Sequence, residues 1–170
     1  MGYPIGSDRR LWNDCCIGTV GGTGDDDEAK TCRSLATRFF KATAGDKVSY
    51  PLGEHPGGYI EITPTRYWVM LIDPTRKSPA AATLTDAESI SLMKSQVAYT
   101  GKYDVDPVQT PDGIKVTVHV DAAANQALAG TNRVLYHRVD GNKMTVKSPA
   151  LVVGASGVTS VVQLEYVKAE

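Results

Sequence analysis

The sequence carries no excess of charge of either sign. Its 170 residues include 18 Lys and Arg against 19 Asp and Glu, which leaves a net charge of −1. Proteins that bind nucleic-acid phosphates usually carry a clear basic excess, so no nucleic acid is expected as a partner. The sequence also lacks a Lys- and Arg-dense amphipathic segment of the kind that binds a membrane surface, so no membrane partner is expected.

Long hydrophobic runs and a disulfide framework are missing as well. No apolar run approaches the ~18 residues of a membrane-spanning helix, and the first residues lack the basic-then-apolar pattern of a signal peptide. The only cysteines are Cys15, Cys16 and Cys32. Three is an odd number, and adjacent cysteines rarely bond to each other. We therefore expect reduced thiols in a cytoplasmic protein.

Several catalytic signatures are absent. The sequence has no Gly-x-Ser-x-Gly elbow, which leaves α/β-hydrolase chemistry unsupported. No dinucleotide fingerprint follows a strand, so a nicotinamide or flavin is not expected. Three scattered histidines do not have the paired spacing of a zinc enzyme. The expectation is a protein that works with no cofactor and no metal.

Residues 1–31 differ in composition from the rest of the chain. Four glycines between Gly18 and Gly24 precede the acidic run Asp25–Glu28, and backbone entropy and charge repulsion both oppose packing there. The glycines run into carboxylates rather than a helix with a Lys, so they are not a phosphate cradle. We predict an N-terminal extension over residues 1–31, a short helix around Leu11 and Trp12 followed by a loop, and a single domain over 32–170.

From residue 33 onward the pattern predicts antiparallel β-structure. Short runs rich in Val, Ile, Tyr and Thr alternate with turn residues such as Pro111-Asp112-Gly113 and Asp140-Gly141-Asn142. The expected strands are Leu35–Ala42, Val48–Tyr50, Gly58–Thr63, Tyr67–Ile72, Gly101–Val105, Ile114–Val120, Arg133–Val139, Lys143–Ser148 and Val158–Lys168.

One helix is predicted within this series of strands. Thr85 and Glu88 have the spacing of a capping box, and Ile90, Met93 and Val97 then share one helical face. A short helical turn is also expected within Asp121–Ala129. Eight to ten antiparallel strands would leave two exposed edges as an open sheet, so we predict an all-β closed antiparallel barrel with one inserted helix. A barrel of about eight strands is either filled by side chains or holds one small ligand.

Several segments in the expected order resemble the lipocalin-like domain family, small intracellular barrels of bacteria and fungi. The resemblance covers about residues 33–168. The segments that carry it are Tyr50–Tyr59, Ile60–Thr63 with Pro64, Tyr67–Leu71, Ala98–Val105 with its Tyr-x-Gly-x-Tyr pattern, Val118–Asp121, Gly130-Thr131 with Arg133, and Asp140–Asn142.

The sequence departs from the family pattern at both ends of the barrel. Cys32-Arg33-Ser34 stands where the family commonly has Gly-Thr-Trp, and a similar Ile17-Gly18-Thr19-Val20 lies too far upstream. Leu164 and Tyr166 replace a late Trp and an Arg. The resemblance implies a barrel with an apolar cavity, but a fold alone does not fix what such a cavity does.

Period-2 alternation sorts the candidate site residues into faces. Tyr99, Gly101 and Tyr103 share a face, which predicts aromatic walls with space above Gly101 for a ligand; barrel core is the alternative. His119 opposes Val118 and Val120, and it either faces water or lines the cavity.

A second group of candidates lies on two other strands. Arg133 and His137 share a face of their strand, and an inward Arg would need an anionic partner from the protein or the ligand. His137 is otherwise an ordinary surface residue. Tyr67, Trp68 and Met70 are predicted wall residues split between the two faces of their strand, with Trp68 and Met70 together.

These residues support a hypothesis of cofactor-free cyclisation or isomerisation of a hydrophobic natural-product intermediate. An apolar cavity can hold a flexible substrate in a reactive conformation, and a few donors can polarise a carbonyl or move a proton. Tyr99, Tyr103 and Arg133 are the expected donors, His119 the general acid or base, and Tyr67, Trp68, Met70, Gly101 and His137 the substrate-binding residues. The alternatives are a carrier of a lipophilic metabolite and a solidly packed interaction domain. A homodimer is compatible with the sequence.

Overall fold

The computed structural model describes residues 33–153 and 158–168. The expected N-terminal helix, the glycine-rich loop and all three cysteines lie outside the described residues. The strands are β1 (Arg33–Ala44), β2 (Lys47–Ser49), β3 (Gly57–Ile62), β4 (Tyr67–Ile72), β5 (Gln96–Thr110), β6 (Gly113–Ala123), β7 (Asn132–Asp140), β8 (Lys143–Lys147), β9 (Leu151–Val153) and β10 (Val158–Lys168).

Eight of these strands close into an antiparallel barrel, as the alternation predicts. Neighbours follow the order β1-β3-β4-β5-β6-β7-β8-β10, and β1 pairs with β10 to complete the circle. β2 extends β1 as a hairpin and β9 pairs with β10 beside the barrel. Short turns force the antiparallel pairing of β3 with β4, of β5 with β6 and of β7 with β8, because a parallel crossover needs a dozen or more residues. The fold class inferred from the sequence is confirmed.

The barrel interior is lined by the apolar alternate positions of each strand. On β4, Tyr67, Val69 and Leu71 are buried while Trp68 between them is exposed. Val116, Val118 and Val120 of β6 are likewise buried, and His119 is exposed. Successive side chains of a strand point to opposite faces of the sheet, which explains this alternation of buried and exposed residues.

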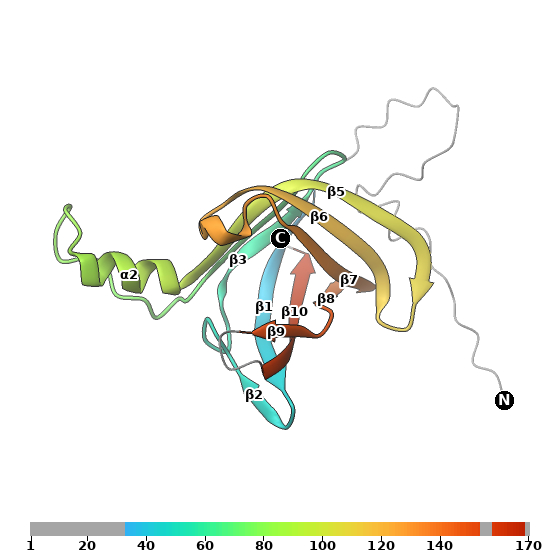
Figure 1. Ribbon diagram of the computed structural model, residues 1–170, viewed down its shortest axis with the longest axis horizontal. Helices are drawn as coiled ribbons and strands as arrows, with labels where there is room; N and C mark the ends of the chain where they lie inside the picture. The colour runs from blue at the N-terminus through green and yellow to red at the C-terminus, as the bar shows by residue number, and fades with distance from the viewer. Residues whose placement is uncertain (1–32, 154–157, 169–170) are drawn as a thin grey trace.

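The helix forms where its capping box predicts it. α2 (Asp86–Lys94) begins after Thr85, whose hydroxyl accepts from the Glu88 backbone N–H while the Glu88 carboxylate accepts from Thr85. The helix extends away from the barrel (Figure 1) and buries none of its residues. The predicted apolar face is therefore not a packing face: Ile90 and Met93 are exposed, and Val97 already belongs to β5.

Three further details differ from or refine the expected elements. β5 begins immediately after the helix at Gln96, because its first residues pair with the end of β4, and it continues to Thr110. β9 (Leu151–Val153) is not among the expected strands. The short helical turn within Asp121–Ala129 is the 3-10 helix η1 (Gln126–Leu128), and β6 occupies the first part of that stretch.

Gly101 brings the backbones of β5 and β6 unusually close. A Cβ at this position would coincide with the backbone carbonyl of His119 on β6. The pairing of the two strands shifts register between Thr100 and Gly101, which is where a β-bulge increases the twist. The expectation of open space for a ligand above Gly101 is therefore wrong, because the neighbouring strand fills it.

No helix within the described residues is long and apolar enough to cross a membrane.

We expect Gly101→Ala to destabilise the barrel by about 1–3 kcal/mol, because the added methyl group must displace backbone rather than a flexible side chain. Gly57→Ala is the matched control, since a Cβ on Gly57 of β3 meets only ordinary contact distances. Urea denaturation of both variants measures the difference. Equal stability of the two variants would show that the close approach at Gly101 is not a constraint.

Candidate functional site

A hydrogen bond crosses the barrel interior from β4 to β7. Tyr67 Oη lies 3.2 Å from Nε2 of His137, and both side chains are about 1% exposed. β5 and β6 lie between these two strands in the sheet, so the contact joins opposite walls rather than neighbours. Buried polar groups of this kind are retained when they are hydrogen-bonded. The alternative that His137 is an ordinary surface residue is wrong. His137 lies two residues after Leu135 on β7, so its side chain points to the same inner face.

Aromatic rings pack around this bond. The Tyr67 ring stacks on Tyr99 with centroids 6.4 Å apart, and it meets Tyr103 and His137 edge to face at 6.2 and 5.7 Å. The Tyr103 hydroxyl donates to the backbone carbonyl of Thr63 at 2.8 Å. The predicted residues Tyr67, Tyr99, Tyr103 and His137 thus form one interior group, and offset and edge contacts of this kind stabilise it beyond simple burial.

Two largely buried tyrosines of this group have hydroxyl groups without a hydrogen-bond partner among the described residues. Tyr99 is 8% exposed and Tyr166 of β10 is 1% exposed, yet no hydrogen bond of either phenol is present in this part of the chain. Neither hydroxyl oxygen is completely enclosed by the protein, so both remain available as hydrogen-bond donors.

Tyr166 is a member of this group that sequence reasoning missed. It stands where the family pattern has an Arg, so the resemblance assigns it no site role. Tyr166 lies two residues after Leu164 on β10, and both residues are buried. This spacing was the signal that could have placed Tyr166 inside the barrel. Tyr166 pairs in register with Met144 of β8, another buried residue.

Arg133, the second residue of β7, faces the same interior. It pairs in register with Val118, which is fully buried, and residues directly opposite each other share a face of the sheet. Arg133 itself is partly exposed, beside the connection that contains η1. Its guanidinium lies close enough to Tyr99 to act on that phenol electrostatically.

The interior groups are neutral near pH 7. Burial raises the pKa of Tyr99 to about 12, an effect that the positive Arg133 opposes. Burial also raises the pKa of Tyr67 and Tyr166 well above the usual value for a phenol, and the neighbouring phenols add to this. Burial lowers the pKa of His137 to about 3. The site therefore presents neutral hydroxyl donors beside one fixed positive charge.

The remaining predicted residues lie on the outer face. Trp68 is 37% exposed and Met70 shares its side of β4, so neither lines the interior. His119 is on the outside of β6, where Nε2 lies 2.7 Å from the Asp104 carboxylate and Nδ1 lies 2.8 Å from the Asn132 amide oxygen. Hydrogen bonds to Asp104 and Asn132 raise the pKa of His119. Of the two alternatives for His119, the structure shows the one in which its side chain faces water.

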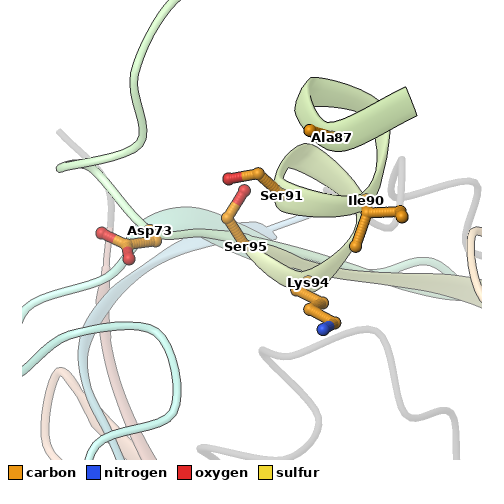
Figure 2. A pocket seen from close by; sticks show the side chains of 6 residues that line it. All are labelled: Asp73, Ala87, Ile90, Ser91, Lys94 and Ser95. Carbon is orange, nitrogen blue, oxygen red and sulfur yellow. The ribbon is translucent and has the colours of Figure 1, made fainter. Parts of the chain in front are cut away.

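A separate open groove of about 440 Å³ runs beside the helix (Figure 2). Asp73, Ser91, Lys94 and Ser95 line it together with Ala87 and Ile90. The Asp73 carboxylate already accepts two hydrogen bonds from Thr75. None of the predicted site residues reaches this groove. Within the described ranges, no three His, Cys, Asp or Glu side chains are grouped to hold a metal ion.

Comparison with protein families gives one match. A model described as a lipocalin-like domain matches residues 34–163, about three quarters of the chain. The comparisons with curated proteins and with solved structures each gave no match.

We expect acid to destabilise the protein through His137. Its folded-state pKa of about 3 lies below the ordinary histidine value of 6.5, so the unfolded chain takes up the proton first as the pH falls. The contribution is complete above pH ~6.5 and is lost progressively towards pH ~3. Between pH 7 and pH 5 this one group should lower the free energy of unfolding by about 2 kcal/mol.

Urea denaturation of the wild type and of His137→Gln at the two pH values isolates this term. His119→Gln is the control, because the raised pKa of His119 gives the opposite sign: its stabilisation is present at acid pH and is lost as the pH rises through the folded-state value. An identical pH dependence of the wild type and His137→Gln would contradict the burial of a neutral imidazole.

Proposed function

The chain belongs to the lipocalin-like domain family, and from this premise we propose that it binds a hydrophobic small molecule inside the barrel. The observation that carries the proposal is the pair of buried phenols, Tyr99 and Tyr166, whose hydroxyl groups have no partner within the described residues. An oxygen-bearing ligand of low polarity supplies an acceptor for the hydroxyls and apolar surface for the valines and leucines around them.

The surroundings of these phenols favour a ligand over a purely structural role. Tyr67 and Tyr103 are placed in the same interior and both have protein partners, His137 and the Thr63 carbonyl. The fold therefore satisfies its own hydroxyls where they serve packing. Tyr99 and Tyr166 differ from them in this one respect, which supports a role in binding.

The second candidate function is cofactor-free cyclisation of the bound molecule. It is favoured by Arg133 beside Tyr99, because a phenol and a guanidinium can together polarise a carbonyl oxygen and stabilise the negative charge that develops on it. A pericyclic ring closure rearranges bonds within the substrate and requires no proton donor or acceptor from the protein.

Isomerisation by proton transfer has weaker support in the interior. Efficient general acid–base catalysis needs a pKa near the working pH, whereas Tyr99 and His137 have values of about 12 and about 3. His119, the predicted acid or base, lies on the outer face. Of the catalytic alternatives, ring closure assisted by hydrogen-bond donors is the one that the geometry supports.

We expect Tyr99→Phe and Tyr166→Phe to weaken binding without weakening the fold. The probe is Prodan, a hydrophobic naphthyl ketone whose fluorescence rises on transfer from water to an apolar site. Loss of one hydrogen bond of about 0.5–1.5 kcal/mol predicts affinity lower by about 2- to 12-fold. Because neither hydroxyl group has a hydrogen-bond partner among the described residues, its removal should leave the free energy of unfolding unchanged or higher.

Tyr103→Phe is the structural contrast, and Tyr59→Phe, on the exposed face of β3, is the surface control. The first should lose stability and the second should change neither property. Absence of Prodan binding to the wild type, or normal binding by the Tyr99→Phe/Tyr166→Phe double variant, would refute the proposal. Mass spectrometry of an organic extract of the purified protein, before and after incubation, then separates an unaltered ligand from a product.

A further inference from the structure

Arg133 is a charged residue on a wall that otherwise carries no charge. The buried polar or charged residues within the described part of the chain are His137, Ser148 and Ser160, so no Asp or Glu is buried there. Arg133 nevertheless shares the inner face of β7 with Leu135 and His137, both of which are buried. A cation partly withdrawn from water is costly unless an opposite charge accompanies it.

The acidic residues near this part of the barrel are already engaged elsewhere. Four ion pairs occur among the described residues, and none includes Arg133. On the two preceding strands, Asp104 of β5 and Asp121 of β6 point outward and pair with His119 and Arg66. No hydrogen bond of the Arg133 guanidinium is found in residues 33–153 and 158–168 either. The protein therefore offers this charge no anionic partner in the part of the chain that is described.

The neighbours of Arg133 are hydrogen-bond donors rather than acceptors. The hydroxyl of Tyr99 lies within electrostatic reach of the guanidinium, and Tyr99 in turn acts on Tyr166. Neutral phenols donate to an anionic oxygen, and a guanidinium offers a planar fork that matches the two oxygens of a carboxylate. One cation, two free hydroxyl donors and apolar walls together form the complement of an oxyanion attached to a hydrophobic body.

We propose that the ligand is an amphiphilic anion, a hydrophobic carboxylic acid or an acidic enol, whose charged oxygen is held by Arg133 and the hydroxyls of Tyr99 and Tyr166. This inference rests on the proposed binding function and narrows it to one chemical class. The apolar remainder of the ligand lies among the inward residues of β4 and β6, which are Val69, Leu71, Val116, Val118 and Val120.

Competition between an acid and its neutral ester tests the assignment. Dodecanoic acid and methyl dodecanoate, and 2-naphthoic acid with its methyl ester, are titrated against bound Prodan at pH 8, where both acids are ionised. The wild type should bind each acid at least about tenfold more tightly than its ester, as a charge-assisted hydrogen bond predicts. Arg133→Gln should lose this preference while it still binds Prodan and both esters.

Two further variants separate charge from fold. Arg133→Lys keeps the charge without the planar fork, so it should retain part of the preference. Arg138→Gln removes an exposed arginine from the outer face of the same strand and should behave as the wild type. If the wild type binds acid and ester equally, or if Arg133→Gln keeps the preference, the anion assignment is wrong although the barrel still binds a small molecule. If neither Prodan nor any competitor binds, the binding function itself fails and the anion assignment fails with it.

Discussion

The hydrogen bond between Tyr67 and His137 is the constraint around which the interior is arranged. It spans the barrel between β4 and β7, two strands that are not neighbours in the sheet. The bond gives the imidazole a partner where no water reaches it, and burial keeps that imidazole neutral. Because Tyr67 extends across the interior to make the bond, its ring becomes the surface on which Tyr99, Tyr103 and His137 pack. The rings of Tyr99, Tyr103 and His137 thus all meet the side chain of Tyr67.

The barrel divides its charges between two faces, and this division gives meaning to the near-zero net charge. The ion pairs of the described strands, such as Arg66 with Asp121 and Lys143 with Glu165, lie on the outside. Each of these pairs joins one basic and one acidic side chain, so it adds no net charge to the outer surface. Arg133 is the exception, since it faces inward without a counter-charge from the described residues. A charge retained in such a place is more readily explained by a ligand than by stability, because hydrophobic packing would stabilise the fold at least as well.

The fold could be predicted from the sequence because local signals agreed with each other. Alternation identified nine strands, short turns made them antiparallel, and Thr85 with Glu88 located the helix. The membership of the interior group could be predicted only in part. Alternation correctly placed Tyr99 and Tyr103 on one face of their strand, and Arg133 and His137 on one face of theirs. It does not say which of the two faces of a strand points into the barrel. Trp68 and Met70 therefore seemed as good a wall as Tyr67, and His119 as good a candidate as His137. The contact of Tyr67 with His137 joins residues 70 positions apart, and it depends on barrel closure, which no local pattern records.

The ionisation of a bound acid tests the central claim most directly. In ¹³C NMR of dodecanoic acid labelled at its carboxyl carbon, the chemical shift reports the protonation of the bound ligand as the pH changes. An oxyanion held by Arg133 and two phenols must have a pKa below that of the free acid, because a cation and hydrogen-bond donors both stabilise the charged form. Burial in an apolar interior without those partners has the opposite effect. The account predicts a lowered pKa in the wild type that returns towards or above the free value in Arg133→Gln. A raised pKa in the wild-type complex would contradict it.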